Sequence, residues 1–190
     1  PPRSTLFPYT TLFRSLAFHE AIPGHHLQNA LNLENDDLSL YRRFGYYTSA
    51  FGEGWALYAE RLSSEIGLAD NPYDELGVLQ SELFRAVRLV VDTGMHFKRW
   101  TREEAIDYMK KITGMSDTEV TVEIERYIVW PGQACSYKVG MLKILELREK
   151  AKQALGESFD IRDFHSVVLD HGEPPLFIVE ELVNEMTSNR

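Results

Sequence analysis

The chain has 190 residues, a formal net charge of −9, 44% hydrophobic residues and a single cysteine. An acidic surface repels nucleic acid and anionic membranes, so we expect neither as a partner. One cysteine excludes an internal disulfide, and no apolar run reaches the roughly 18 residues that a membrane-spanning helix needs. The cell envelope and the cytoplasm both stay open as compartments, and the oligomeric state is not indicated.

The first fifteen residues, PPRSTLFPYTTLFRS, show no pattern that belongs to a fold. The stretch back-translates, codon by codon, into a common short-read sequencing adapter, so we interpret residues 1–15 as an artefactual arm and expect it to be unpacked. Without the two arginines of this arm, the chain has 18 Lys and Arg residues and 29 Asp and Glu residues, which gives a net charge of −11. Residues 16–190 are enough for one domain, and we expect them to be part of a longer protein.

Helical spacing of hydrophobic residues runs through most of the chain. It predicts helices over residues 16–33, 40–66 and 73–97. Two capping boxes predict two further helix starts, because Thr101 and Ser116 are each followed three positions later by a glutamate. The second of these helices is rich in β-branched residues in its first half.

The C-terminal third continues the helical pattern. A long amphipathic run follows Pro131, which we place in the first helical turn, and ends near Gly156. Two short helices, split by residues 172–175, close the chain. Since there is no internal repeat and no convincing pair of strands, the predicted fold class is all-α.

The stretch HEAIPGHHLQ, residues 19–28, is the first candidate for chemistry. Zinc peptidases often carry H-E-x-x-H, because residues four apart share a helix face. Here His25 follows His19 by six positions, about 240° round a helix, and His26 follows by seven, about 10 Å along the axis. The Pro-Gly pair after Ile22 costs about 4 kcal/mol within a helix, so we predict a break that returns a later histidine to His19. The alternative is a helix that ends at Ile22, with surface histidines beyond it.

The segment FGEGWALYAE supplies a third candidate ligand, Glu53. Its neighbours Gly52, Gly54 and Ala56 are small, which lets two helix backbones approach closely. A zinc site with two histidines needs a third protein ligand, often a glutamate on another helix. Taken alone, Glu53 is an ordinary helix carboxylate; together with the histidines it predicts a metal site.

Five segments in this order resemble the domain-of-unknown-function 885 family: HEAIPGHHLQ, FGEGWALYAE, DTGMHFKRWT, ERYIVWPGQACSYKVG and FHSVVLDHGEPPL. The resemblance covers residues 16–190 and implies a bacterial, mostly helical metallopeptidase of the zincin-type clan. The gluzincin branch of that clan uses two histidines and one glutamate as zinc ligands, and its oligopeptidases often carry H-E-x-G-H. Placing Gly24 and His25 on that G-H makes His25 the second ligand. His26 stays open as the competing ligand, or as a substrate-binding residue.

The implied activity is zinc-dependent hydrolysis of a peptide bond. His19, His25 and Glu53 would hold Zn²⁺, Glu20 would be the general base, and the partner would be a peptide or small amide substrate. Two other classes stay open: a non-catalytic helical binding module, and a zinc hydrolase that acts on a non-peptide amide or an ester. Retention of Glu20 favours an enzyme, because a scaffold has no need of a base beside its ligands.

The sequence offers further candidate catalytic residues. Tyr127 or Tyr137 could stabilise an oxyanion, and each could equally pack on Trp130. His96 is a candidate catalytic residue at a helix end, where a helix dipole favours a cation, or it packs on Trp100.

Arg126 could bind a substrate carboxylate or pair with Glu123 or Glu125. Cys135 has no basic neighbour in sequence, so we interpret it as a small buried hydrophobe rather than a nucleophile. His165 is expected to be structural or exposed.

Overall fold

The computed structural model describes residues 9–188. Within that range the chain is helical and contains no strand, so the all-α prediction is confirmed. Two short turns, a π-helical turn (Tyr41–Gly45) and a 3-10 turn (Gly156–Ser158), accompany the α-helices. The α-helices are α1 (Tyr9–Glu20), α2 (His25–Glu34), α3 (Ser49–Glu65), α4 (Pro72–His96), α5 (Arg102–Thr113), α6 (Asp117–Val129), α7 (Gln133–Leu155), α8 (Ile161–Leu169) and α9 (Leu176–Ser188).

Local capping accounts for several helix starts. Thr101 and Ser116 form the two predicted capping boxes, at the starts of α5 and α6. Before α4, the Asn71 side chain accepts hydrogen bonds from the first backbone amides of the helix. The placement of Pro131 in a first helical turn was wrong, because Gly132 is the N-cap of α7, with a φ of 82° that favours glycine.

One predicted helix, residues 40–66, is interrupted. The backbone is extended at Tyr46, and α3 begins only at Ser49. The physical reason is a long-range contact: the Thr48 amide donates to Glu173 Oε2 at 3.2 Å, and the Thr48 hydroxyl donates to the Glu173 carbonyl at 2.8 Å. Glu173, 125 residues away in sequence, thus keeps the backbone before α3 out of the helix. The spacing of hydrophobic residues cannot indicate such a contact.

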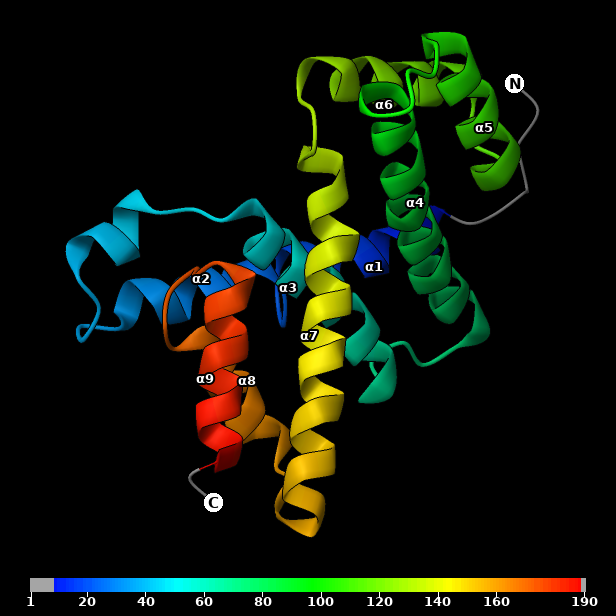
Figure 1. Ribbon diagram of the computed structural model, residues 1–190. Helices are drawn as coiled ribbons and strands as arrows, with labels where there is room; N and C mark the ends of the chain where they lie inside the picture. The colour runs from blue at the N-terminus through cyan, green and yellow to red at the C-terminus, as the bar shows by residue number, and fades with distance from the viewer. Residues whose placement is uncertain (1–8, 189–190) are drawn as a thin grey trace.

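The long helix α7 runs through the middle of the molecule, with α5 and α6 at one end and α8 and α9 beside the other (Figure 1). Helix α3 crosses α7 at two glycines. A Cβ on Gly140 would lie 1.9 Å from the Ala50 carbonyl oxygen, and one on Gly54 would lie 2.4 Å from the Gly140 Cα. The small residues around Glu53 therefore do allow a close helix approach, but the partner at Gly54 is α7 rather than the histidine-bearing segment.

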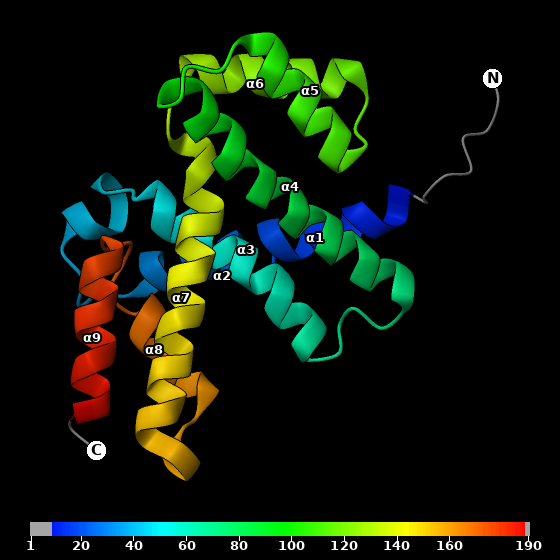
Figure 2. The same cartoon turned by 45° about the vertical axis from the view of Figure 1, so that its right-hand side comes forward.

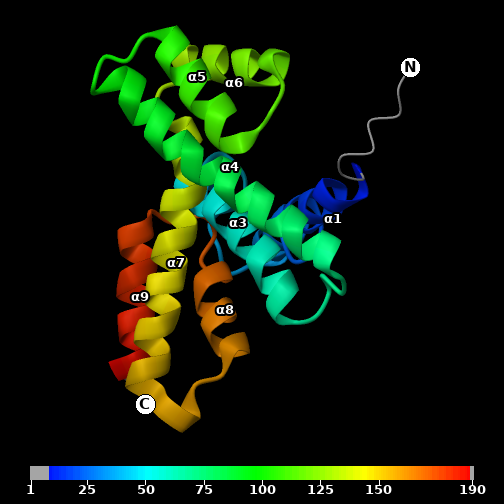
Figure 3. The same ribbon diagram turned by 90° about the vertical axis from the view of Figure 1, so that its right-hand side faces the viewer.

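Two hydrophobic clusters stabilise this arrangement. The larger joins α3 and α7 to α8 and α9 around Trp55 and Ile144. The smaller joins the C-terminal half of α4 to α5 and α6 around Met109 and Ile124. Helix α1 lies against α3 and α4, on the side away from α9 (Figures 2 and 3). Among the described residues, no helix is both long enough and apolar enough to span a membrane.

The N-terminal arm departs in part from expectation. Helix α1 already begins at Tyr9, and Ser15 is buried, with its hydroxyl hydrogen-bonded to Glu60. Arg14 pairs with Asp70 at 3.0 Å. The expectation of an unpacked arm was wrong for Arg14 and Ser15, since Ser15 lies one turn before His19 on the same helix face. Residues 1–8 lie outside the described residues, and the adapter interpretation stays a prediction.

Candidate metal centre

A tight turn separates the two histidine-bearing helices. Helix α1 ends at Glu20, α2 begins at His25, and the peptide bond before Pro23 is cis. The Trp55 indole donates to the Pro23 carbonyl at 2.9 Å, which fastens the turn to α3. A Cβ at Gly24 would lie 1.9 Å from the His19 carbonyl oxygen, so only glycine fits there. The predicted break is confirmed.

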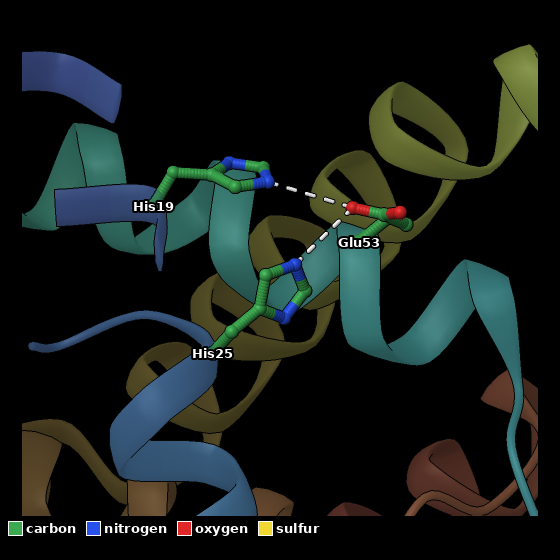
Figure 4. Close-up of side chains that lie close together, drawn as sticks. All are labelled: His19, His25 and Glu53. Atoms are coloured by element: carbon green, nitrogen blue, oxygen red, sulfur yellow. Dashed lines mark hydrogen bonds and ion pairs between the residues drawn. The ribbon is translucent and has the colours of Figure 1, made fainter. Parts of the chain in front are cut away.

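This turn brings His19 and His25 together over Glu53, each from a different helix (Figure 4). Their candidate ligand atoms all lie within 4.8 Å of one another. Glu53 Oε2 is 3.5 Å from His19 Nε2 and 3.3 Å from His25 Nε2. His26 is exposed and is not in this group, so the geometry selects His25 between the two competing histidines.

These separations fit a small cation. Four ligands about 2.05 Å from a tetrahedral zinc lie about 3.3 Å from one another, close to both nitrogen–oxygen distances here. Burial fits as well, since the side chain of His19 is 3% exposed and that of Glu53 is 12% exposed. A donor set of two imidazoles and one carboxylate is one that zinc sites in proteins use.

The Nδ1 atom of His19, which faces away from Glu53, contacts a buried carboxylate. Glu60 lies two turns after Glu53 on α3 and is 1% exposed, and its Oε1 is 2.8 Å from His19 Nδ1. Burial alone would raise the pKa of Glu60, but its hydrogen bond with His19 and the charge of Arg85 outweigh burial and lower it. The charged Glu60 carboxylate therefore accepts a hydrogen bond from the Nδ1–H group and leaves His19 Nε2 facing Glu53.

His25 is oriented through an amide. Its Nδ1 lies 3.4 Å from Gln28 Oε1, and Gln28 Nε2 donates to Glu173 Oε1 at 2.9 Å. Because the Glu173 carboxylate takes the amide hydrogens, the Gln28 oxygen must face His25 and accept from Nδ1. Burial raises the pKa of Glu173, more than the hydrogen bond from Thr48 lowers it.

Three hydrogen-bond acceptors therefore converge. With both Nδ1 atoms donating outward, each neutral imidazole turns an Nε2 lone pair toward Glu53 Oε2. Such an arrangement is stable only if a positive charge, a proton or a metal ion, lies between the three groups. With a proton between the groups, a protonated histidine can donate from Nε2: burial would raise the pKa of Glu53, but such hydrogen bonds from His19 and His25 lower it to about 2. Burial would lower the pKa of His19, but hydrogen bonds with Glu53 and Glu60 raise it.

The two candidate tyrosines have separate environments. The ring of Tyr137 stacks on His19, with 6.1 Å between centroids and 22° between planes. Tyr127 is buried away from this group: its hydroxyl donates to Glu123 and accepts from Arg88 Nε at 2.8 Å. Burial strongly raises the pKa of Tyr127. Tyr137 is therefore the tyrosine at the candidate centre, and Tyr127 is structural.

Glu20 is exposed at the last position of α1, directly after His19. The C-terminal end of a helix is the negative end of its dipole, so a carboxylate there does not stabilise α1. Glu20 is not among the residues whose candidate ligand atoms converge, and its predicted role as a general base stays a prediction.

His96 and Arg126 were also predicted site residues. His96 Nε2 lies 2.9 Å from the Tyr127 carbonyl oxygen, so the ring joins the end of α4 to α6. His96 is not in the group of His19, His25 and Glu53. Arg126 donates to Gln133 Oε1 at 2.8 Å and lies 3.8 Å from Glu123. Cys135 is half-buried rather than fully buried, and burial raises the pKa of its thiol to about 11, which disfavours the thiolate.

Four polar residues around the cluster were not predicted: Gln28, Glu60, Gln133 and Glu173. Two carried a signal, since Gln28 follows His25 by three positions and Glu60 follows Glu53 by seven, each on a shared helix face. Gln133 and Glu173 come from distant segments, and nothing in their local sequence indicates the contact.

Comparison with known proteins identifies relatives of similar structure. A "putative lipoprotein" of Colwellia psychrerythraea is 54% identical with a TM-score of 0.90 over 93% of this chain. A "putative lipoprotein of unknown function" of Shewanella oneidensis is 30% identical with a TM-score of 0.85 over 92% of this chain. The chain spans only 30% and 32% of those two structures. A search of curated proteins finds no match.

The family described as "Bacterial protein of unknown function (DUF885)" matches residues 3–183. This range begins inside the stretch interpreted as an adapter and includes every residue of the candidate metal centre. The chain therefore belongs to the DUF885 family of bacterial proteins.

Proposed function

We propose that this chain is part of the catalytic region of a zinc-dependent peptidase of the gluzincin type. The observation that carries the proposal is the convergence of three acceptor atoms, from His19, His25 and Glu53, within 4.8 Å. Both histidines have their other nitrogen tied to a buried acceptor, as metal-binding histidines usually do.

A bound zinc ion would supply Lewis acidity, which activates water and polarises a carbonyl group. The Glu20 carboxylate would take a proton from the attacking water and deliver it to the nitrogen of the leaving amine. The Tyr137 hydroxyl would donate to the oxyanion that forms on the former carbonyl. The substrate class is a peptide or a small amide, and the rest of a longer chain would complete the cleft.

Two substitutions separate the proposed roles. Glu20→Gln keeps the size of the side chain but cannot accept a proton, so we expect turnover to be lost while zinc stays bound. Glu53→Gln removes an anionic ligand, so we expect zinc affinity and activity to fall together. Metal analysis and hydrolysis of a mixed peptide library measure both, in a full-length relative that carries the same residues.

The matched control is Glu34→Gln, an exposed carboxylate at the end of α2, which should change neither zinc content nor turnover. Full activity in Glu20→Gln, or a wild type that binds no zinc after reconstitution, would favour the non-catalytic binding module instead. Hydrolysis of esters or non-peptide amides but not of peptides would favour the other zinc hydrolase.

A further inference from the structure

Gln133, the first residue of α7, contacts three groups at the candidate centre. Its Oε1 accepts from Arg126 Nη2 at 2.8 Å. Its Nε2 lies 3.3 Å from the Tyr137 hydroxyl oxygen and 3.5 Å from Glu53 Oε1. The residue is buried, and Glu53 turns its other oxygen toward the two histidines.

The orientation of this amide follows from its partners. A guanidinium only donates hydrogen bonds, so Arg126 must face the amide oxygen of Gln133. The amide hydrogens then face Glu53 and Tyr137, which both offer oxygen lone pairs. In the reverse orientation the amide NH₂ of Gln133 would face the Arg126 guanidinium, and the amide oxygen would face the Glu53 carboxylate. Neither pair can form a hydrogen bond, so Arg126 fixes one orientation of the amide.

This orientation determines what the Tyr137 hydroxyl can do. Its oxygen accepts from Gln133, so its own hydrogen must be donated elsewhere. The guanidinium groups of Arg85 and Arg88 lie 5.6 and 4.7 Å from the centre of the Tyr137 ring and offer no acceptor. Glu53 Oε1 lies 3.5 Å from the same Gln133 Nε2, and the Glu53 carboxylate interacts with the Tyr137 hydroxyl as a hydrogen-bond acceptor. The hydrogen of the hydroxyl therefore points toward Glu53, one of the three candidate ligands.

We propose that Gln133, held by Arg126, is a positioning residue that directs the Tyr137 hydroxyl to donate toward the carbonyl oxygen of a bound substrate. The inference rests on the proposed function, which makes Tyr137 the oxyanion donor. It assigns Arg126 a role through Gln133, in place of direct contact with a substrate carboxylate.

A double-mutant cycle tests this, in a full-length relative with the same residues and at saturating zinc. We expect Tyr137→Phe to lower kcat by about 10²–10³-fold, the usual loss of one oxyanion donor. Gln133→Met removes the amide hydrogens and should lower kcat by about 10–100-fold. In the Tyr137→Phe background it should cause little further loss, because its effect passes through the missing hydroxyl. Gln80→Met, a glutamine of α4 outside the centre, is the matched control and should keep full kcat.

A second variant covers the case in which Gln133→Met does not fold. Gln133→Glu keeps the size and offers an acceptor that would take the Tyr137 hydrogen, so we expect kcat to fall while zinc stays bound. A readout without turnover comes from NMR of the zinc-free protein. The side-chain amide signals of Gln133, identified by their absence in Gln133→Glu, should shift in both Tyr137→Phe and Arg126→Met.

The outcomes separate the two proposals. Additive kcat losses, or Gln133 amide signals that do not move in Tyr137→Phe, would overturn the role of Gln133 while zinc binding and turnover stand. A wild type without zinc-dependent turnover would overturn the proposed function, and the role of Gln133 with it.

Discussion

At the scale of single residues, the orientation of each candidate histidine ligand depends on a buried side chain that is not itself a candidate ligand. His19 turns Nε2 toward Glu53 because Glu60 holds its Nδ1 at 2.8 Å. His25 does so because Gln28 and Glu173 hold its Nδ1 side. The motif therefore indicates which residues meet, whereas the buried partners decide which atoms face each other.

His165 gives a pH-dependent prediction at this scale. Its Nε2 lies 2.8 Å from the Tyr58 hydroxyl, which also accepts from Arg148 at 3.2 Å. Tyr58 must therefore donate to a neutral His165. Burial, with a smaller effect from the charge of Arg148, lowers the pKa of His165 to about 4.

The folded state then binds fewer protons than the unfolded state between about pH 6.5 and 4. The stability contributed by neutral His165 is fully present above about pH 6.5 and is lost progressively as the pH falls toward 4. We expect urea unfolding of the wild type to lose more free energy over this range than that of His165→Gln, which keeps an acceptor for Tyr58 but does not titrate. Equal pH slopes for the two proteins would contradict this assignment.

At the scale of helices, the crossing of α3 and α7 positions Glu53 and Gln133. Backbone contact at Gly54 and Gly140 leaves no room for a side chain. Both residues of the pair are needed, since a methyl on either one meets the backbone of the other helix.

We therefore expect Gly140→Ala to destabilise the protein by about 1–3 kcal/mol, the usual cost of overpacking, despite the better helix propensity of alanine. Zinc affinity should fall with it, because separation of the helices moves Glu53. Thermal unfolding and zinc titration measure the two effects. Val139→Ala, at an exposed neighbouring position of α7, is the control and should change stability by less than about 0.5 kcal/mol. Unchanged stability in Gly140→Ala would show that the helices can separate freely.

At the scale of the whole molecule, two separate hydrophobic clusters stabilise different parts of the fold. The cluster of α3, α7, α8 and α9 contains Trp55 and Tyr137, which contact the candidate centre. The cluster of α4, α5 and α6 also includes Ala134 of α7 and packs the two capping-box helices at the N-terminal end of α7 (Figure 1).

This division predicts that stability and zinc binding can be changed separately. Met109 is fully buried in the second cluster, and Met109→Ala should cost about 2–5 kcal/mol of unfolding free energy. The protein that remains folded should bind zinc with unchanged affinity, measured by titration well below its melting temperature. A parallel loss of zinc affinity would show that the α5–α6 pair supports the centre.

The sequence by itself determined the all-α class, most helix boundaries and the short set of residues from which the converging ones come. Hydrophobic spacing, capping boxes and the Pro-Gly break all act within a few residues, so they can be predicted locally. Only the tertiary structure decided between His25 and His26 and between Tyr137 and Tyr127, and only it interrupted the predicted helix before α3. Those outcomes depend on contacts between residues far apart in the chain, such as Gln133 with Glu53 and Glu173 with Thr48. Such contacts form only when the helices pack, and no local pattern encodes them.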